Sequence, residues 1–428
     1  MRGLLLLLLA AFLFHHSCDC RGQETQPAER GSAPMGQTPS ALDRVIALHD
    51  WMGLERALAG QGDAGPAFYR GVLLNHRGQY ADSVKLLEPL VADVASGSDR
   101  MREKYARMAL ADDYFRTFRY KQAAEEYAAL EKCCATQLDT RDHENTDLAA
   151  SILPLLAGAP AQTLELSDGF TVPLDDNGTG GRIVEVYVDG HPTHWLFDPA
   201  ANFTWLSQAR AKQAGLRLLG NGELKVRGLG GGAIKVQAAV IPQLKLGNAI
   251  FHNVPAVIYA DDGKYVYPFD GVLAQPLLAA LGIVSASDDD HLTVLRETPL
   301  SGGAPLFADG DSLLAGAGAK GEEQLYVIDP ARASSRLDGR HLPTHAAELA
   351  GLGAGLGADS PGSAKAWSIE TLTLDFGDTP AVFRELPVAA QGDGFSYGVL
   401  SEDALDQLET YTFDFRSMRF LVRVHEGR

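Results

Sequence analysis

The pattern of apolar positions divides the chain into a helical part and a β-rich part. From residue 41 to residue 157, apolar residues recur at helical spacing, for example at Leu42, Val45 and Ile46. Beyond this stretch they alternate with polar residues, as in 183–188, between Gly and Asp-Gly turns. The sequence therefore predicts a multidomain α + all-β protein in which a helical domain precedes the strands.

A different pattern marks the N-terminus. Arg2 is followed by an unbroken apolar run and then by small and polar residues, which is the order of a secretory signal peptide over residues 1–20. Residues 21–40 are rich in Gln, Pro, Ser and Gly and indicate a flexible linker. We therefore expect a secreted or periplasmic protein with no transmembrane segment. Because Cys18 loosely resembles a lipid-attachment site, a membrane-anchored lipoprotein is an alternative.

Two stretches within the helical domain resemble each other. Residues 76–84 and 116–124 share their pattern, with Tyr80 and Tyr120 at the same place. These hairpins are similar to tetratricopeptide-type repeats, which stack and offer a concave surface to a peptide or protein partner. An irregular helical bundle without a partner is the alternative interpretation.

The β-rich part also contains a repeat, predicted as one lobe over 161–300 and a second over 301–428. In each copy an apolar strand runs into Asp-Pro-Ala, at Asp198 and at Asp329. Glycine-rich sequence follows, then further strands, and finally a short apolar strand that leads into a short helix. The final strand and helix occupy residues 270–281 in the first copy and 397–408 in the second.

This order of elements resembles the retropepsin-like (clan AA) aspartic proteases. The resemblance implies a bilobed pepsin/retropepsin fold in one chain, which needs no second copy, so we expect a monomer. It also implies that Asp198 and Asp329 form the catalytic dyad and that the glycine-rich segments cover the substrate. The substrate-binding residues implied in this way are Gly228, Gly230, Gly231, Gly232, Trp367 and Ser368.

The chemistry of this family requires two carboxylates. Like charges held close together cannot both ionise, so the pair shares one proton. The ionised member takes a proton from water and the protonated member donates to the scissile carbonyl oxygen. The expected function is that of an exported aspartic endopeptidase with a polypeptide substrate and with no metal or cofactor.

Both copies depart from the family pattern in the same way. The hydroxyl residue after each aspartate is replaced by Pro199 or Pro330, which removes both the cross-bracing hydroxyl and a backbone N–H. The next glycine is Ala200 or Ala331, and alanine is strained at a positive φ. The alternative is therefore a catalytically inactive pseudoprotease that binds a peptide or protein in the cleft between the lobes, on the helical domain, or on both. Each aspartate could also serve only to cap a turn before proline.

The composition and net charge of the chain exclude two classes of partner. The chain has 428 residues, of which 46% are hydrophobic, and a formal net charge of −18. That charge repels nucleic acid and anionic membranes, so we expect neither as a partner. Adjacent cysteines bridge only with strain, so Cys133 and Cys134 are expected to be two thiols packed in a helix.

Overall fold

The computed structural model describes residues 40–61, 65–97, 99–176, 178, 181–227, 233–260, 267–296, 300–318, 322–339, 367–389 and 396–425. The predicted signal peptide, the linker up to residue 39 and Cys18 lie outside these residues. Within the described helices, none combines the length and the apolar character needed to cross a membrane.

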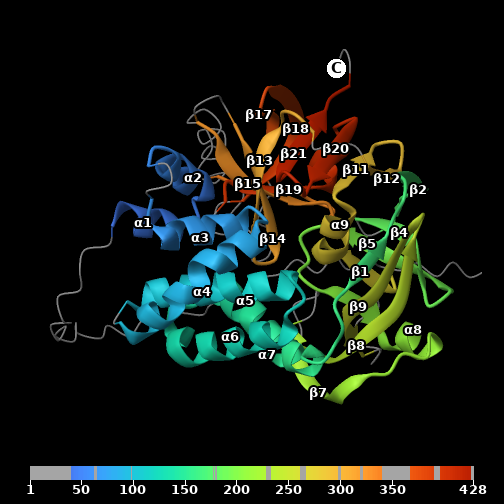
Figure 1. The fold of residues 1–428 in the computed structure, drawn as a ribbon. Helices are drawn as coiled ribbons and strands as arrows, with labels where there is room; N and C mark the ends of the chain where they lie inside the picture. Colours follow the sequence, from blue (N-terminus) through green and yellow to red (C-terminus); the bar gives the residue numbers. More distant parts are fainter. Residues whose placement is uncertain are drawn as a thin grey trace, which may run out of the picture. The chain divides into compact units, whose positions relative to one another are not determined.

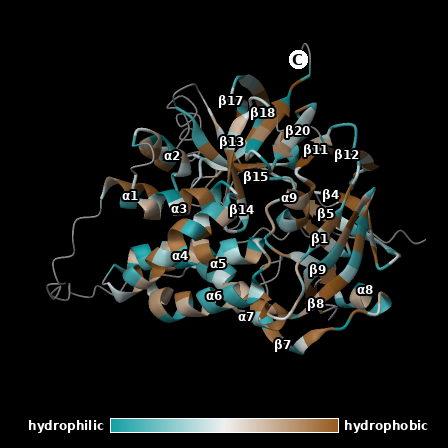
Figure 2. Ribbon diagram, viewed as in Figure 1, coloured by the Kyte–Doolittle hydropathy of each residue, from teal (hydrophilic) through white to brown (hydrophobic). Residues whose placement is uncertain are grey.

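The first part of the described chain is helical (Figure 1). Its helices are α1 (Ala41–Ala47), α2 (Trp51–Ala59), α3 (Ala67–His76), α4 (Tyr80–Ser96), α5 (Arg100–Arg116), α6 (Tyr120–Cys134) and α7 (Thr140–Leu156). Each helix from α3 to α6 packs on the next one along the chain. Figure 2 shows both apolar and polar residues on α4 to α7.

The two similar hairpins begin alike in the structure. Helices α4 and α6 start at Tyr80 and Tyr120, the matching positions of the repeat. The turn before each start contains one residue in the left-handed region, Gly78 with φ 67° and Phe118 with φ 62°. The likeness of the two hairpins therefore extends to their turns, while their similarity to tetratricopeptide repeats stays a prediction.

The remaining described chain is β-rich and forms two sheets, so the predicted change from helical to alternating pattern is confirmed. One sheet has the order β1-β9-β6-β10-β5-β4-β8-β7, with β3 paired to β4. Its strands are β1 (Thr163–Glu165), β3 (Asp175–Asp176), β4 (Arg182–Val188), β5 (His191–Asp198), β6 (Thr204–Ser207), β7 (Leu219–Arg227), β8 (Ala233–Leu246), β9 (Ala249–Tyr259) and β10 (Gly271–Ala274).

The other sheet has the order β17-β18-β16-β19-β15-β14-β13-β21-β20-β11-β12-β2. Its strands are β2 (Phe170–Pro173), β11 (Ile283–Ser287), β12 (His291–Leu295), β13 (Ala304–Asp309), β14 (Ser312–Ala317), β15 (Gln324–Asp329), β16 (Arg336–Asp338), β17 (Trp367–Phe376), β18 (Thr379–Ala389), β19 (Gly398–Ser401), β20 (Thr410–Asp414) and β21 (Arg419–Arg423). Three short helices connect the strands: α8 (Gln208–Gln213), α9 (Gln275–Leu281) and α11 (Glu402–Leu405).

Half of this second sheet has a mirrored strand order. From β2 to β13 the order is β2-β12-β11-β20-β21-β13, and its centre is the antiparallel pair β11 and β20. Ser285 and Thr412, the third residue of each strand, lie opposite each other. The strand that follows α9 thus pairs with the strand that follows α11, and equivalent residues meet at the centre.

The adjacent cysteines form a disulfide between Cys133 and Cys134, so the prediction of two free thiols packed in a helix was wrong. The physical reason is that α6 ends at this pair. The backbone of Cys134 has φ −134° and ψ 12°, which has left the helical region, and a 3₁₀ turn (Ala135–Gln137) follows. The sequence pattern did not locate this helix end.

A buried ion network joins the helical part to β13. Asp309 is 3% exposed, and its Oδ2 lies 2.8 Å from His49 Nδ1 and 3.3 Å from Arg141 Nη2. Trp51 Nε1 donates to the same oxygen at 3.1 Å. Burial would raise the pKa of Asp309, but the charges of Arg141 and His49 outweigh it and lower that pKa well below its usual value. Asp309 is therefore an ionised anchor for α2 and α7.

Replacing this anchor should destabilise the protein. Asp309→Asn leaves His49 and Arg141 without their shared carboxylate, and breaking a buried ion pair costs about 3–5 kcal/mol. Urea denaturation of the full chain measures this loss. Asp378→Asn, at an exposed turn between β17 and β18, is the matched control and should change the free energy of unfolding little. Equal unfolding free energies for the two variants would contradict the anchor role.

Candidate active site

The two aspartates stand at the same point of two similar strand arrangements. β5 ends at Asp198 and runs parallel to β10, where Ala274 lies opposite Asp198. β15 ends at Asp329 and runs parallel to β19, where Ser401 lies opposite Asp329. In each case the partner strand also pairs antiparallel with the short strand after the aspartate loop, β6 or β16. The repeated order of elements seen in the sequence is therefore repeated in the strand pairing.

The alternation of side chains along β5 explains which face of the strand Asp198 occupies. Trp195 and Phe197 are fully buried in one apolar cluster, whereas Leu196 packs into the second cluster, which also contains residues of the helices. Because successive side chains of a strand point to opposite faces, Asp198 projects to the same face as Leu196.

The backbone of the first loop holds Asp198. Its Oδ1 accepts hydrogen bonds from the N–H of Ala200 at 3.1 Å and of Ala201 at 3.0 Å. This is the local turn capping expected of an aspartate before proline. Neither Ala200 nor Ala331 is among the described residues with a positive φ, so the expected backbone strain at these alanines is absent.

The second loop holds Asp329 differently. Its Oδ1 accepts the N–H of Ala331 at 3.2 Å, while its Oδ2 lies 2.6 Å from Nε of Arg332. Arg332 was not predicted from the sequence. The sequence shows only that the copies differ here, because Arg332 stands three residues after Asp329, where the first copy has Ala201.

The two carboxyl groups interact with each other. Asp198 is 9% exposed and Asp329 is 8% exposed. Burial, and after it the charge of Asp329, raises the pKa of Asp198 to about 7. Burial also raises the pKa of Asp329, against the opposing charge of Arg332. Turn capping alone would not require two buried carboxylates within electrostatic range, and the charge of one carboxylate favours the protonated form of the other.

Gly181 links the two loops. A Cβ at this position would lie 2.8 Å from the carbonyl oxygen of Ala331 and 3.0 Å from Cδ1 of Leu196. The chain before β4 therefore packs closely between the second aspartate loop and the strand that carries Asp198. Its N–H also donates to Oε2 of Glu402 at 2.7 Å, at the start of α11.

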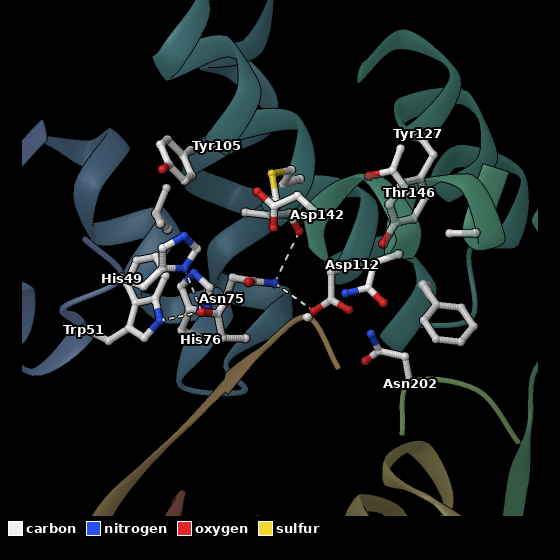
Figure 3. Close-up of a pocket in the computed structure, with 18 of the residues that line it drawn as sticks. His49, Trp51, Asn75, His76, Tyr105, Asp112, Tyr127, Asp142, Thr146 and Asn202 are labelled. Atoms are coloured by element: carbon white, nitrogen blue, oxygen red, sulfur yellow. Dashed lines mark hydrogen bonds and ion pairs between the residues drawn. The ribbon is translucent and has the colours of Figure 1, made fainter. Parts of the chain in front are cut away.

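A cavity of about 60 Å³ lies beside the first loop, between helices α3, α5 and α7 (Figure 3). Asn202, Phe203 and the turn at Asp309 also line it. Asn202 Oδ1 accepts a hydrogen bond from Arg116 Nη2 at 2.5 Å, and the ring of Phe203 lies 4.8 Å from that of Phe115. Helix α5 is thus in direct contact with the loop that carries Asp198, although neither aspartate lines the cavity.

The structure describes only some of the predicted substrate-binding residues. Gly228, Gly230, Gly231 and Gly232 lie outside the described residues, and for Trp367 only the backbone, at the start of β17, is described. Ser368 is exposed on β17 opposite Pro387. Their role as a cover over substrate stays a prediction.

Comparison with known proteins identifies a family for the first copy of the β-rich part. The family described as aspartyl protease matches residues 184–278, from β4 through the Asp198 loop and into α9. Residues 184–278 form an aspartic-protease-like domain. No curated protein matches the chain. The second copy, with Asp329, is connected to this family only through the repeated strand pairing.

The buried Asp198 should make the free energy of unfolding depend on pH. Its pKa rises from an unfolded value of about 3.9 to about 7 in the folded protein, so only the folded state keeps the proton between these values. The free energy of unfolding of the wild type should therefore fall relative to Asp198→Asn as the pH rises from about 4 to about 7, by up to about 4 kcal/mol. Urea denaturation of both proteins across this range measures the difference.

Asp189→Asn is the control for this comparison, because Asp189 is exposed in the turn between β4 and β5. A difference between wild type and Asp198→Asn that does not change with pH would contradict the raised pKa.

Proposed function

We propose that the chain is an exported, two-lobed aspartic endopeptidase whose dyad is Asp198 and Asp329. The observation that carries the proposal is that two equivalent loops present buried carboxyl groups that interact electrostatically. The match of the first copy to the aspartyl protease family supports the chemistry, and the apolar N-terminal run of the sequence supports export.

The proposed reaction needs one shared proton in the dyad. Water attacks the scissile carbonyl carbon, gives a proton to the ionised carboxylate, and the protonated carboxyl donates its proton to the carbonyl oxygen. The resulting gem-diol then collapses. Its C–N bond breaks, and the leaving nitrogen takes a proton from the dyad. One of the two hydroxyl groups gives its proton to the dyad as the carboxyl product forms, so the pair ends with a single proton.

The pH dependence follows from the pKa of Asp198. A dyad without its proton cannot protonate the carbonyl oxygen, so activity should decline as the pH rises through about 7. Burial raises both pKa values, so the dyad should work at higher pH than two solvent-exposed aspartates would allow.

The replaced residues after each aspartate favour a second candidate, a pseudoprotease that binds peptide without cutting it. Pro199 and Pro330 carry no hydroxyl to bond across the two loops. In this case the peptide would lie in the cleft between the lobes or on the helices, and the helical part would be a docking surface for a protein partner.

Cleavage of a mixed peptide library separates the two candidates. Wild type, Asp198→Asn, Asp329→Asn and the control Asp189→Asn are incubated with the library from pH 4 to pH 8, and the products are identified by mass spectrometry. We expect cleavage by the wild type and the control, and at least about a 10³-fold loss in each dyad variant, since proton transfer contributes about 10²–10⁴-fold and both transfers are affected.

An unchanged rate in either dyad variant would exclude the proposed dyad. No cleavage by the wild type at any pH, together with retention of library peptides by the wild-type protein, would support the pseudoprotease instead.

A further inference from the structure

The two aspartate loops are equivalent in backbone but not in charge. The carbonyl oxygen of Ala201 accepts the N–H of Gln275, the first residue of α9, at 3.0 Å. The carbonyl oxygen of Arg332 accepts the N–H of Glu402, the first residue of α11, also at 3.0 Å. The same backbone position therefore carries a methyl group in one copy and a guanidinium group in the other.

The guanidinium group of Arg332 contacts Asp329 directly. Arg332 Nε lies 2.6 Å from Asp329 Oδ2, which makes it a direct charged hydrogen bond. The described contacts of Asp198 are the backbone N–H groups of Ala200 and Ala201, both on Oδ1. The charge of Arg332 also lowers the pKa of Asp198, but less than the loop N–H groups do. On the pKa of Asp329 its effect is second only to burial and opposes the charge of Asp311.

Arg332 also adds a donor within the second loop. Pro330 has neither a hydroxyl nor a backbone N–H, whereas the arginine side chain brings an N–H to the carboxyl group of Asp329. A carboxylate can accept about four hydrogen bonds, so the bonds from Arg332 and Ala331 leave acceptor sites for a water molecule.

Resting on the proposed dyad, we propose that Arg332 is a positioning residue that divides the roles of the two aspartates. It holds Asp329 as the ionised carboxylate that activates water, and it leaves Asp198 as the member that carries the proton. The dyad is thereby asymmetric before any substrate binds.

The direct test is a pH titration of both carboxyl groups in the full chain, in which NMR of ¹³C-labelled aspartate reports the ionisation of each group. Asp198→Asn and Asp329→Asn assign the two signals. In the wild type, the Asp329 carboxyl should ionise at lower pH than that of Asp198. In Arg332→Gln the Asp329 midpoint should rise by at least about one pH unit, because an opposite charge at this range shifts a carboxyl by about 1–3 units.

Three further variants sharpen this test. Arg332→Lys should keep the order of ionisation, since it keeps the charge. The double variant Ala201→Arg/Arg332→Ala moves the guanidinium to the other loop and should reverse the order. Arg423→Gln is the matched control: Arg423 is a similarly exposed ion-paired arginine, with 70% of its side chain exposed against 73% for Arg332, and its loss should leave both midpoints unchanged.

An order of ionisation that is the same in wild type and Arg332→Gln, with both midpoints unmoved, would overturn the proposal, and this readout requires no activity. If the wild type cleaves peptides, the acid limb of kcat against pH should also move upward in Arg332→Gln, with KM nearly unchanged. Cleavage with an unmoved acid limb would refute the role of Arg332 while leaving the dyad intact. An absence of cleavage would refute the endopeptidase and leave the titration to decide on Arg332.

Discussion

The pairing of β11 with β20 is the constraint on which the arrangement of the two aspartates depends. β11 follows α9 and thus the strand beside Asp198, and β20 follows α11 and thus the strand beside Asp329. Because these strands meet antiparallel with Ser285 opposite Thr412, each copy is attached to the other by the same short path. Two loops that are 131 residues apart in the chain, 198 to 329, then lie close enough for the charge of Asp329 to act on Asp198.

Placing two carboxyl groups together in a buried site is costly unless they share a proton or meet a cation. Burial and the charge of Asp329 raise the pKa of Asp198, which favours its protonated form, while Asp329 contacts the cationic Arg332. The proline after each aspartate removes the usual cross-brace, and the backbone N–H groups of the alanines hold each aspartate within its own loop without a left-handed residue. The altered motif is thus compatible with an organised pair of loops.

The helices are part of the same framework. Asp309 anchors α2 and α7 to β13, and Arg116 holds Asn202 just beyond the Asp198 loop. These contacts couple the stability of the helical part to that of the strands that carry the aspartates. A replacement in the helices is therefore expected to act on the loop through Asn202 and Phe203, whether or not the helices also bind a partner.

The sequence by itself determined the change from helices to strands, the repeated order of elements in the β-rich part, and Asp198 and Asp329 as equivalent residues. These features depend on local periodicity and on motifs that each copy carries within a short span. The tertiary structure alone decided that Arg332 contacts Asp329, that Asp309 anchors the helices, and that Cys133 bonds to Cys134. Such contacts depend on where a loop turns, where a helix ends and which charges are buried together, and no local pattern of apolar and polar residues encodes those distances.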